Sequence, residues 1–180
     1  KENPNVSYFS GTASFIAPFK GSEMGTGGTD YSKITTYDGT TQRIGLSTNL
    51  SMAQQSFSFD LVSLVEKKIG AIPATDKVKW VRENVGSFYF YWLGYGNSPS
   101  GYKATIKAWN TGPGVGYVYP YSHTAATVSR LEWGISNTSL PNYIDSNGFV
   151  TFLAHSEVAD GVANSTLYTD YVSLVVNMKQ

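Results

Sequence analysis

The sequence predicts a mainly β protein, an antiparallel β-sandwich with one or two short inserted helices. Short stretches of alternating hydrophobicity follow one another along the 180 residues, and Gly, Pro, Asn-Gly and Asp-Gly separate them. Only 14% of the residues are charged, against about 25% in typical soluble domains. We expect one domain over residues 1–180, because a chain of this length can bury a sizeable core.

The first third of the chain predicts short strands joined by turns. Tyr8 to Phe15 alternates as a first strand, and the four glycines between Gly21 and Asp30 predict a mobile loop. Asp38-Gly39 predicts a turn before a strand at Arg43 to Leu46, and Ser56 to Asp60 begins the next apolar stretch.

Two short helices are predicted after this stretch. Apolar spacing of three and four marks the first, in Leu61, Leu64, Val65, Lys68 and Ile69. Gly70 is placed to end it. Thr75 or Asp76 is the N-cap of the second, which carries a stripe of Val78, Val81 and Val85.

The strongest strand signal is Ser87 to Tyr95. Phe88, Phe90 and Trp92 share one phase, and the other phase is phenolic. One phase faces the core and the other solvent, and the alternation alone is compatible with either choice. Later strands are predicted at Tyr102–Trp109, Tyr117–Tyr121 with a break at Pro120, Thr127–Trp133, Phe149–Ala154 and Leu167–Val176. About nine strands in one domain fit a jelly roll or a galactose-binding-like sandwich.

Charge and composition exclude several functions. Thirteen basic and thirteen acidic residues cancel, so no long-range field favours nucleic acid or an anionic membrane. The absence of cysteine excludes disulfides, thiolate zinc sites and cysteine nucleophiles. No apolar run approaches the roughly 20 residues that a membrane-spanning helix needs, so we expect no membrane insertion. The uncharged polar residues that replace the charges are typical of extracellular β-proteins.

Catalysis is the weaker expectation. The two histidines, His123 and His155, are not near a Gly-x-Ser-x-Gly motif. His155 and Glu157 would share a strand face and could form half of a metal site, although a surface pair is the simpler interpretation. A glycoside hydrolase needs two carboxylates about 5–10 Å apart, whereas the acids here occur mostly at turns and helix starts. We therefore predict that the chain is not an enzyme.

A structural calcium ion is the one cofactor that the sequence suggests. Asp170 shares its phase with Val172, Leu174 and Val176, so it begins the inward row of the last strand if they face the core. A carboxylate there needs donors or a cation, and loop carbonyls with a carboxylate suit calcium. Asp160 and Asp60 are weaker candidates for the same ion. The alternative is that Asp170 accepts backbone N–H groups or pairs with an arginine.

Aromatic residues favour a binding role. Sugar C–H faces stack on Tyr and Trp rings, and the thirteen tyrosines exceed what a small core needs. The predicted ligand-binding residues lie around two Gly/Pro-containing loops: Tyr95, Asn97, Tyr102, Lys103, Lys107, Trp109, Tyr117, Tyr119 and Tyr121. The alternative is that most of these rings pack across strands as ordinary β-formers.

Several segments from Phe59 onwards resemble a known type of module. They are Phe59 to Gly70, Ile72-Pro73, Trp92 to Gly101, Tyr143 to Gly148 and Tyr168 to Val172. They look like β-sandwich modules appended to Gram-positive phage tail or baseplate proteins and to secreted surface proteins of Firmicutes. The closing Thr-Asp-Tyr-Val-Ser-Leu is similar to the end of jelly-roll carbohydrate-binding modules.

The resemblance implies a part of a larger secreted or phage-tail protein, located extracellularly, at a cell surface or on a virion. Its partner would be a polysaccharide or cell-wall glycan, and an oligomer is implied if it belongs to a phage tail. The alternative function is a structural or assembly domain of a tail fibre or surface layer that contacts protein.

Overall fold

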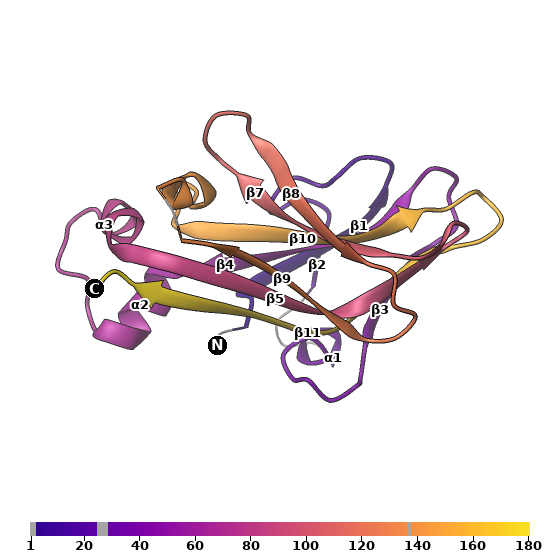
Figure 1. The fold of residues 1–180 in the computed structure, drawn as a ribbon, viewed down its shortest axis with the longest axis horizontal. Helices are drawn as coiled ribbons and strands as arrows, with labels where there is room; N and C mark the ends of the chain where they lie inside the picture. Colours follow the sequence, from indigo (N-terminus) through magenta and orange to yellow (C-terminus); the bar gives the residue numbers. More distant parts are fainter. Residues whose placement is uncertain (1–2, 25–28, 137) are drawn as a thin grey trace.

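The computed structural model describes residues 3–24, 29–136 and 138–180, and it shows two antiparallel sheets packed face to face (Figure 1). The six-stranded sheet has the order β2 (Ser22–Met24), β1 (Val6–Thr12), β4 (Met52–Asp60), β10 (Phe149–Val158), β7 (Ala104–Asn110) and β8 (Gly116–His123). The five-stranded sheet contains β3 (Gln42–Leu46), β11 (Ser165–Met178), β5 (Val85–Ser98), β6 (Gly101–Tyr102) and β9 (Ser129–Ile135), which pairs with β5. The predicted sandwich is therefore confirmed.

The connectivity of the long strands is that of a jelly roll. Strands β3, β5, β9 and β11 lie in one sheet, and β1, β4, β7, β8 and β10 lie in the other. Apart from the β7–β8 hairpin, each long strand is followed by one in the opposite sheet, so most connections cross the sandwich.

Both predicted helices are present, at the end of the sandwich where the C-terminus lies (Figure 1). In α2 (Leu61–Ile69), the Asp60 side chain accepts the Ser63 N–H at 3.0 Å, and Gly70 ends the helix with a φ of +85°. In α3 (Lys77–Asn84), Asp76 accepts the Lys79 N–H. Val85, which was expected on the helical stripe, instead begins β5. The other helical segments are α1 (Thr29–Ser32) and the 3-10 turn η1 (Leu140–Tyr143). No helix within the described ranges has the length and apolar character needed to cross a membrane.

The strands also differ from the sequence prediction, and β1 ends at Thr12 rather than at Phe15. Part of the predicted glycine-rich loop is the short strand β2, which pairs with β1, while residues 25–28 of that loop lie outside the described residues. The predicted strand from Tyr102 is interrupted at Lys103, so that β6 and β7 belong to different sheets. Strand β8 continues through Pro120, which is tolerated because β8 is the edge strand of its sheet.

The core lies between the two sheets and decides the orientation of β5. Phe88, Phe90 and Trp92 are fully buried, and the Phe90 ring stacks on Phe152 of β10 with centroids 4.1 Å apart. The phenolic phase of β5 therefore faces outward.

The two sheets differ in how far their outer faces are covered by other segments. The segment after β1, residues 13–20, crosses the outer face of the six-stranded sheet, where the Ile16 N–H donates to Oε1 of the buried Gln54 at 2.8 Å. Phe19 of the same segment packs edge-on against Phe149. The outer face of the five-stranded sheet is accessible instead, and it presents exposed Arg43, Arg130 and Glu132.

Candidate binding face

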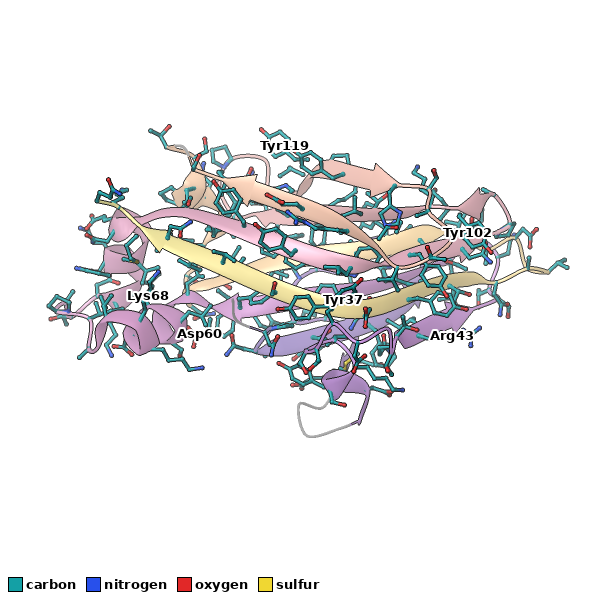
Figure 2. All side chains as sticks on the ribbon, turned by 60° about the horizontal axis from the view of Figure 1, so that its bottom comes forward. Tyr37, Arg43, Asp60, Lys68, Tyr102 and Tyr119 are labelled. Atoms are coloured by element: carbon teal, nitrogen blue, oxygen red, sulfur yellow. The ribbon has the colours of Figure 1, made fainter. Side chains whose placement is uncertain are left out.

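The outer face of the five-stranded sheet gathers aromatic and charged side chains from four strands. Figure 2 looks towards this side of the molecule, with Tyr37, Arg43 and Tyr102 labelled around it. Its members are Arg43 of β3, Tyr168 and Tyr171 of β11, Tyr89, Tyr91, Leu93 and Tyr95 of β5, and Arg130 and Glu132 of β9. We call this surface the tyrosine face.

A β-bulge in β11 places two tyrosines on this face. Thr169 pairs with Gly94 and Tyr171 pairs with Leu93, so Asp170 is an extra residue. Thr169 and Asp170 are both fully buried, and Tyr168 and Tyr171 therefore both point outward. The Trp92 indole donates to the Thr169 hydroxyl at 3.1 Å, which fixes the bulge to the core.

A hollow of about 470 Å³ occupies the middle of the tyrosine face. It is lined by Thr35, Thr36, Tyr37, Tyr91, Leu93, Arg130 and Tyr171. Tyr37, from the loop before β3, is 65% exposed. The Arg130 guanidinium lies 4.6 Å from the centroid of the Tyr91 ring and pairs with Glu132, so it is held in place at the rim.

A second group lies beside the hollow on the same face. The rings of Tyr95 and Tyr168 stack with centroids 4.3 Å apart and planes 10° apart, and the Arg43 guanidinium is 5.9 Å from the Tyr168 ring centroid. Partial burial raises the pKa of the Tyr95 phenol, with smaller contributions from Tyr168 and Tyr102. The Tyr95 hydroxyl therefore remains a hydrogen-bond donor at neutral pH.

The nine predicted ligand-binding residues do not form one patch. Tyr95 and Asn97 are on the outward phase of β5, and Asn97 pairs with Tyr102 of β6, so these three lie at one end of the tyrosine face. Lys103 forms an ion pair with Glu157 at 2.7 Å. The remaining five residues belong to β7 and β8 of the other sheet.

Lys107, Trp109 and Tyr117 lie on the outer face of the six-stranded sheet beside Phe15. Trp109 and Tyr117 contact each other edge-to-face at 4.8 Å, Phe15 packs against Tyr117, and the Lys107 ammonium lies 4.5 Å from the Phe15 ring centroid. Burial raises the pKa of the Tyr117 phenol. These side chains use one another as packing partners because residues 13–20 fold over them, and the local sequence pattern carries no sign of that contact.

Tyr119 and Tyr121 lie at the edge of the sandwich between β8 and β9. They line a hollow of about 200 Å³ with Trp133 and Tyr143. They are 64% and 51% exposed, but they do not face the same way as Tyr95. The sequence prediction therefore joined residues that the fold separates into three places.

One family model matches most of the chain. Residues 23–178 match the AF_1625_C family, described as the C-terminal domain of an uncharacterized protein. The chain belongs to the AF_1625_C family. The match begins in β2 and includes the whole five-stranded sheet with the tyrosine face, and the six-stranded sheet except β1, which precedes it together with the covering segment. No curated protein matches the chain.

The two predicted calcium ligands of the AF_1625_C domain lie in different elements, Asp160 in the loop after β10 and Asp170 in the bulge of β11. Oδ1 of Asp160 accepts the N–H groups of Val162 and Ala163, and these bonds lower the pKa of Asp160. Oδ1 of Asp170 accepts the Gly39 N–H at 3.1 Å and a longer bond from Asp38. No group of three or more His, Asp or Glu residues in the described ranges is placed to hold a metal ion.

Asp170 nevertheless keeps one feature that suits a cation. Its Oδ2 is buried and accepts no hydrogen bond from the described part of the chain. Burial, the largest influence, raises the pKa of Asp170. Calcium at Asp170 thus stays a prediction, with Oδ2 as the atom that would bind the ion.

His155 and Glu157, considered above as half of a metal site, have separate partners. The His155 ring lies under Phe15, with centroids 4.8 Å apart, and its Nδ1 is 2.9 Å from the Ser156 carbonyl oxygen. Burial lowers the pKa of His155. Glu157 instead forms an ion pair with Lys103.

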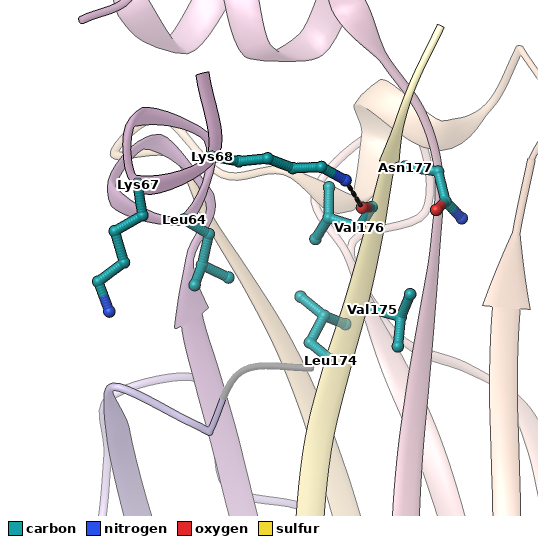
Figure 3. Close-up of a pocket in the computed structure, with 7 residues that line it drawn as sticks. All are labelled: Leu64, Lys67, Lys68, Leu174, Val175, Val176 and Asn177. Carbon is teal, nitrogen blue, oxygen red and sulfur yellow. Dashed lines mark hydrogen bonds between the residues drawn. The ribbon is translucent and has the colours of Figure 1, made fainter. Parts of the chain in front are cut away.

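A groove of about 350 Å³ separates α2 from the C-terminal part of β11 (Figure 3). Leu64 and Leu174 lie on either side of it, and the Lys68 ammonium reaches across to donate to the Val176 carbonyl at 3.2 Å. Strand β3 pairs with β11 only over Ser165–Thr169, so no described strand covers this later part of the β11 edge.

Proposed function

We propose that this AF_1625_C domain is a non-catalytic module that binds a cell-surface or wall polysaccharide through the tyrosine face. The observation that carries the proposal is the 470 Å³ hollow with exposed Tyr37 at its rim and Tyr171 beside it. Aromatic rings offer sugar C–H faces a large contact area at low entropic cost, and phenol hydroxyls bind sugar hydroxyls.

We assign roles within the site from the exposed surface of each side chain and from the contacts that hold it in place. Tyr37 is the ring for stacking because most of its surface is exposed. Arg130 supplies hydrogen bonds at the rim, since its position is held by Tyr91 and Glu132. Tyr95, Asn97 and Tyr102 extend the site at one end of the face. An open hollow of this kind predicts weak affinity for each module.

The surroundings of the carboxylates support binding rather than hydrolysis. Asp60 and Asp76 cap α2 and α3, and Asp145 accepts the N–H groups of Asn147 and Phe149. Asp38 accepts the N–H of Thr40. Each of these acids thus has a role in shaping the backbone, as Asp commonly does at turns and helix starts.

The wider context of the proposal rests on likeness. The resemblance to modules of phage tails and secreted surface proteins, and the description of the family as a C-terminal domain, support a module within a larger protein. The corresponding location is extracellular, at a cell surface or on a virion.

The test is retention of the purified domain, with and without calcium, on Gram-positive cell walls and a broad glycan array. We expect retention on a defined polysaccharide, and Tyr37→Ala should weaken it about tenfold, equivalent to about 1.4 kcal/mol. Tyr119→Ala is the matched control, because Tyr119 is equally exposed but lies outside the tyrosine face. It should bind like the wild type.

Each other outcome has a defined meaning. Unchanged binding by Tyr37→Ala would exclude this face as the site. Retention on no glycan, together with a trimer by light scattering, would support the assembly function instead. Release of sugar products that stops on substitution of a carboxylate would show a hydrolase.

A further inference from the structure

Three strands of the tyrosine face place an arginine and two tyrosines in one row. Arg43 of β3 pairs with Tyr168 of β11, and Tyr168 pairs with Tyr95 of β5. Neighbouring strands lie about 4.8 Å apart. The ring centroids of Tyr95 and Tyr168 are 4.3 Å apart and their planes are nearly parallel, so each ring covers one face of the other between the two strands.

This packing changes what the pair can offer a ligand. The faces that Tyr95 and Tyr168 turn to each other are not available for stacking a sugar, and Arg43 lies 5.9 Å from the Tyr168 ring centroid. The row therefore presents polar groups, the guanidinium and the phenol hydroxyls, rather than a flat apolar surface. These groups are hydrogen-bond donors in a row across the strands.

Arg43 is also a cation without a carboxylate partner. It is exposed, and no acidic side chain of the described residues pairs with it. Arg130 on the same face is neutralised by Glu132, and Lys103 at its end is neutralised by Glu157. The local charge of the tyrosine face is therefore positive at Arg43, although the whole chain is neutral.

We propose that the polysaccharide bound by the tyrosine face is acidic, with a carboxylate on its sugar rings, and that Arg43, Tyr168 and Tyr95 form the carboxylate subsite. This inference rests on the proposed function. A planar guanidinium binds a carboxylate through two parallel hydrogen bonds, and a phenol hydroxyl adds a third donor.

The position of the row relative to the hollow defines the ligand further. Because of the bulge, Tyr171 pairs with Leu93, only two positions along β5 from the Tyr95 that pairs with Tyr168, so the two tyrosines lie about 7 Å apart along the strand at the usual rise. A chain of sugars can therefore place one carboxylate at Arg43 and a neighbouring ring in the hollow beside Tyr37. The subsite fits an oligosaccharide of a uronate polymer rather than a single sugar.

The experiment compares polymers that differ only in charge. Polygalacturonate, alginate and hyaluronate are each titrated into the purified domain beside the same polymer with its carboxylates reduced to alcohols. We expect the wild type to bind at least one acidic polymer, and about tenfold or more tighter than its reduced form. Arg43→Gln should lower affinity for the acidic polymer by about 10- to 100-fold and leave affinity for the reduced form unchanged.

Two controls separate this subsite from general effects. Tyr37→Ala should weaken the acidic and the reduced polymer by the same factor, because it acts through stacking. Lys79→Gln removes another exposed cation, on α3 at the end of the sandwich opposite to β3 (Figure 1), and should change neither affinity. A melting curve of Arg43→Gln like that of the wild type would show that the fold is retained.

The inference that the ligand is acidic would be overturned if the wild type bound an acidic polymer and its reduced form with equal affinity, or if it bound neutral glycans alone. Either result would leave the proposed function standing. Unchanged binding of the acidic polymer by Arg43→Gln would overturn the assignment of the subsite. Binding of no glycan of either kind would remove the proposed function, and this inference with it.

Discussion

The bulge that directs Tyr168 and Tyr171 outward depends on a buried hydroxyl, so Thr169→Val should be costly although the two side chains have nearly the same shape. The Thr169 hydroxyl accepts from the Trp92 indole at 3.1 Å and lies 3.3 Å from Gln55 Oε1. All three residues are fully buried. Valine would leave both the indole N–H and the Gln55 oxygen without this partner, and water does not reach them.

An unsatisfied buried polar group costs about 1–3 kcal/mol, so two of them predict a loss of about 2–6 kcal/mol. For a domain of this size, that corresponds to a fall in melting temperature of about 4–24 °C. The measurement is urea unfolding followed by tryptophan fluorescence, to which Trp92 contributes together with the other three tryptophans. Thr105→Val is the matched control, because Thr105 bonds only to the exposed Ser122 hydroxyl, which can turn to water. A loss for Thr169→Val no larger than that of Thr105→Val would refute the role of this contact.

Two further predictions concern ions and pH. If calcium binds at Asp170, chelator should lower the melting temperature of the wild type and leave Asp170→Asn unaffected, whereas an unchanged wild-type melting temperature in chelator would remove the calcium prediction. Because burial lowers the pKa of His155 below 6.5, the unfolded chain takes up a proton that the native imidazole does not. Stability should therefore fall as the pH drops below about 6.5, by at most about 1.4 kcal/mol per pH unit from this group. His155→Gln should flatten that slope in urea titrations at several pH values, and parallel slopes would contradict the explanation.

Features set by neighbouring residues could be predicted from the sequence. The helix at Leu61–Ile69 with its glycine end, an N-cap at Thr75 or Asp76, and the shared phase of Phe88, Phe90 and Trp92 all follow from short-range spacing, and all are present. In the structure, Asp76 is the cap and that phase of β5 faces the core. Turn residues and alternation also predicted the sandwich, because strand faces depend on a period of two.

The binding face could be predicted only in part, because contacts between distant segments form it. Trp109 and Tyr117 had the pattern of exposed aromatics, but Phe15, about a hundred residues earlier, packs against Tyr117. Tyr37 and Arg130 come from separate loops and strands and were not predicted to meet.

The β11 bulge is a second reason why the binding face could not be predicted in full. In a regular strand, Tyr168 would share its phase with Asp170 and Val172 and point into the core. One extra residue reverses that, and the bulge is stabilised by the side chains of Trp92 and Gln55 from other strands. The sequence signal that could have indicated it is the pair of polar residues, Thr169 and Asp170, next to each other between two tyrosines.

Lys68, which spans the groove beside α2, opposes aggregation of the domain at high local concentration. An uncovered strand edge offers its carbonyls and N–H groups to any other chain that approaches in an extended form, and edge lysines oppose such pairing. Lys68 already occupies the Val176 carbonyl, and it brings a positive charge that a second copy would have to bury. Many copies can therefore lie next to one another on one surface without edge-to-edge pairing of β11 and growth into a fibre.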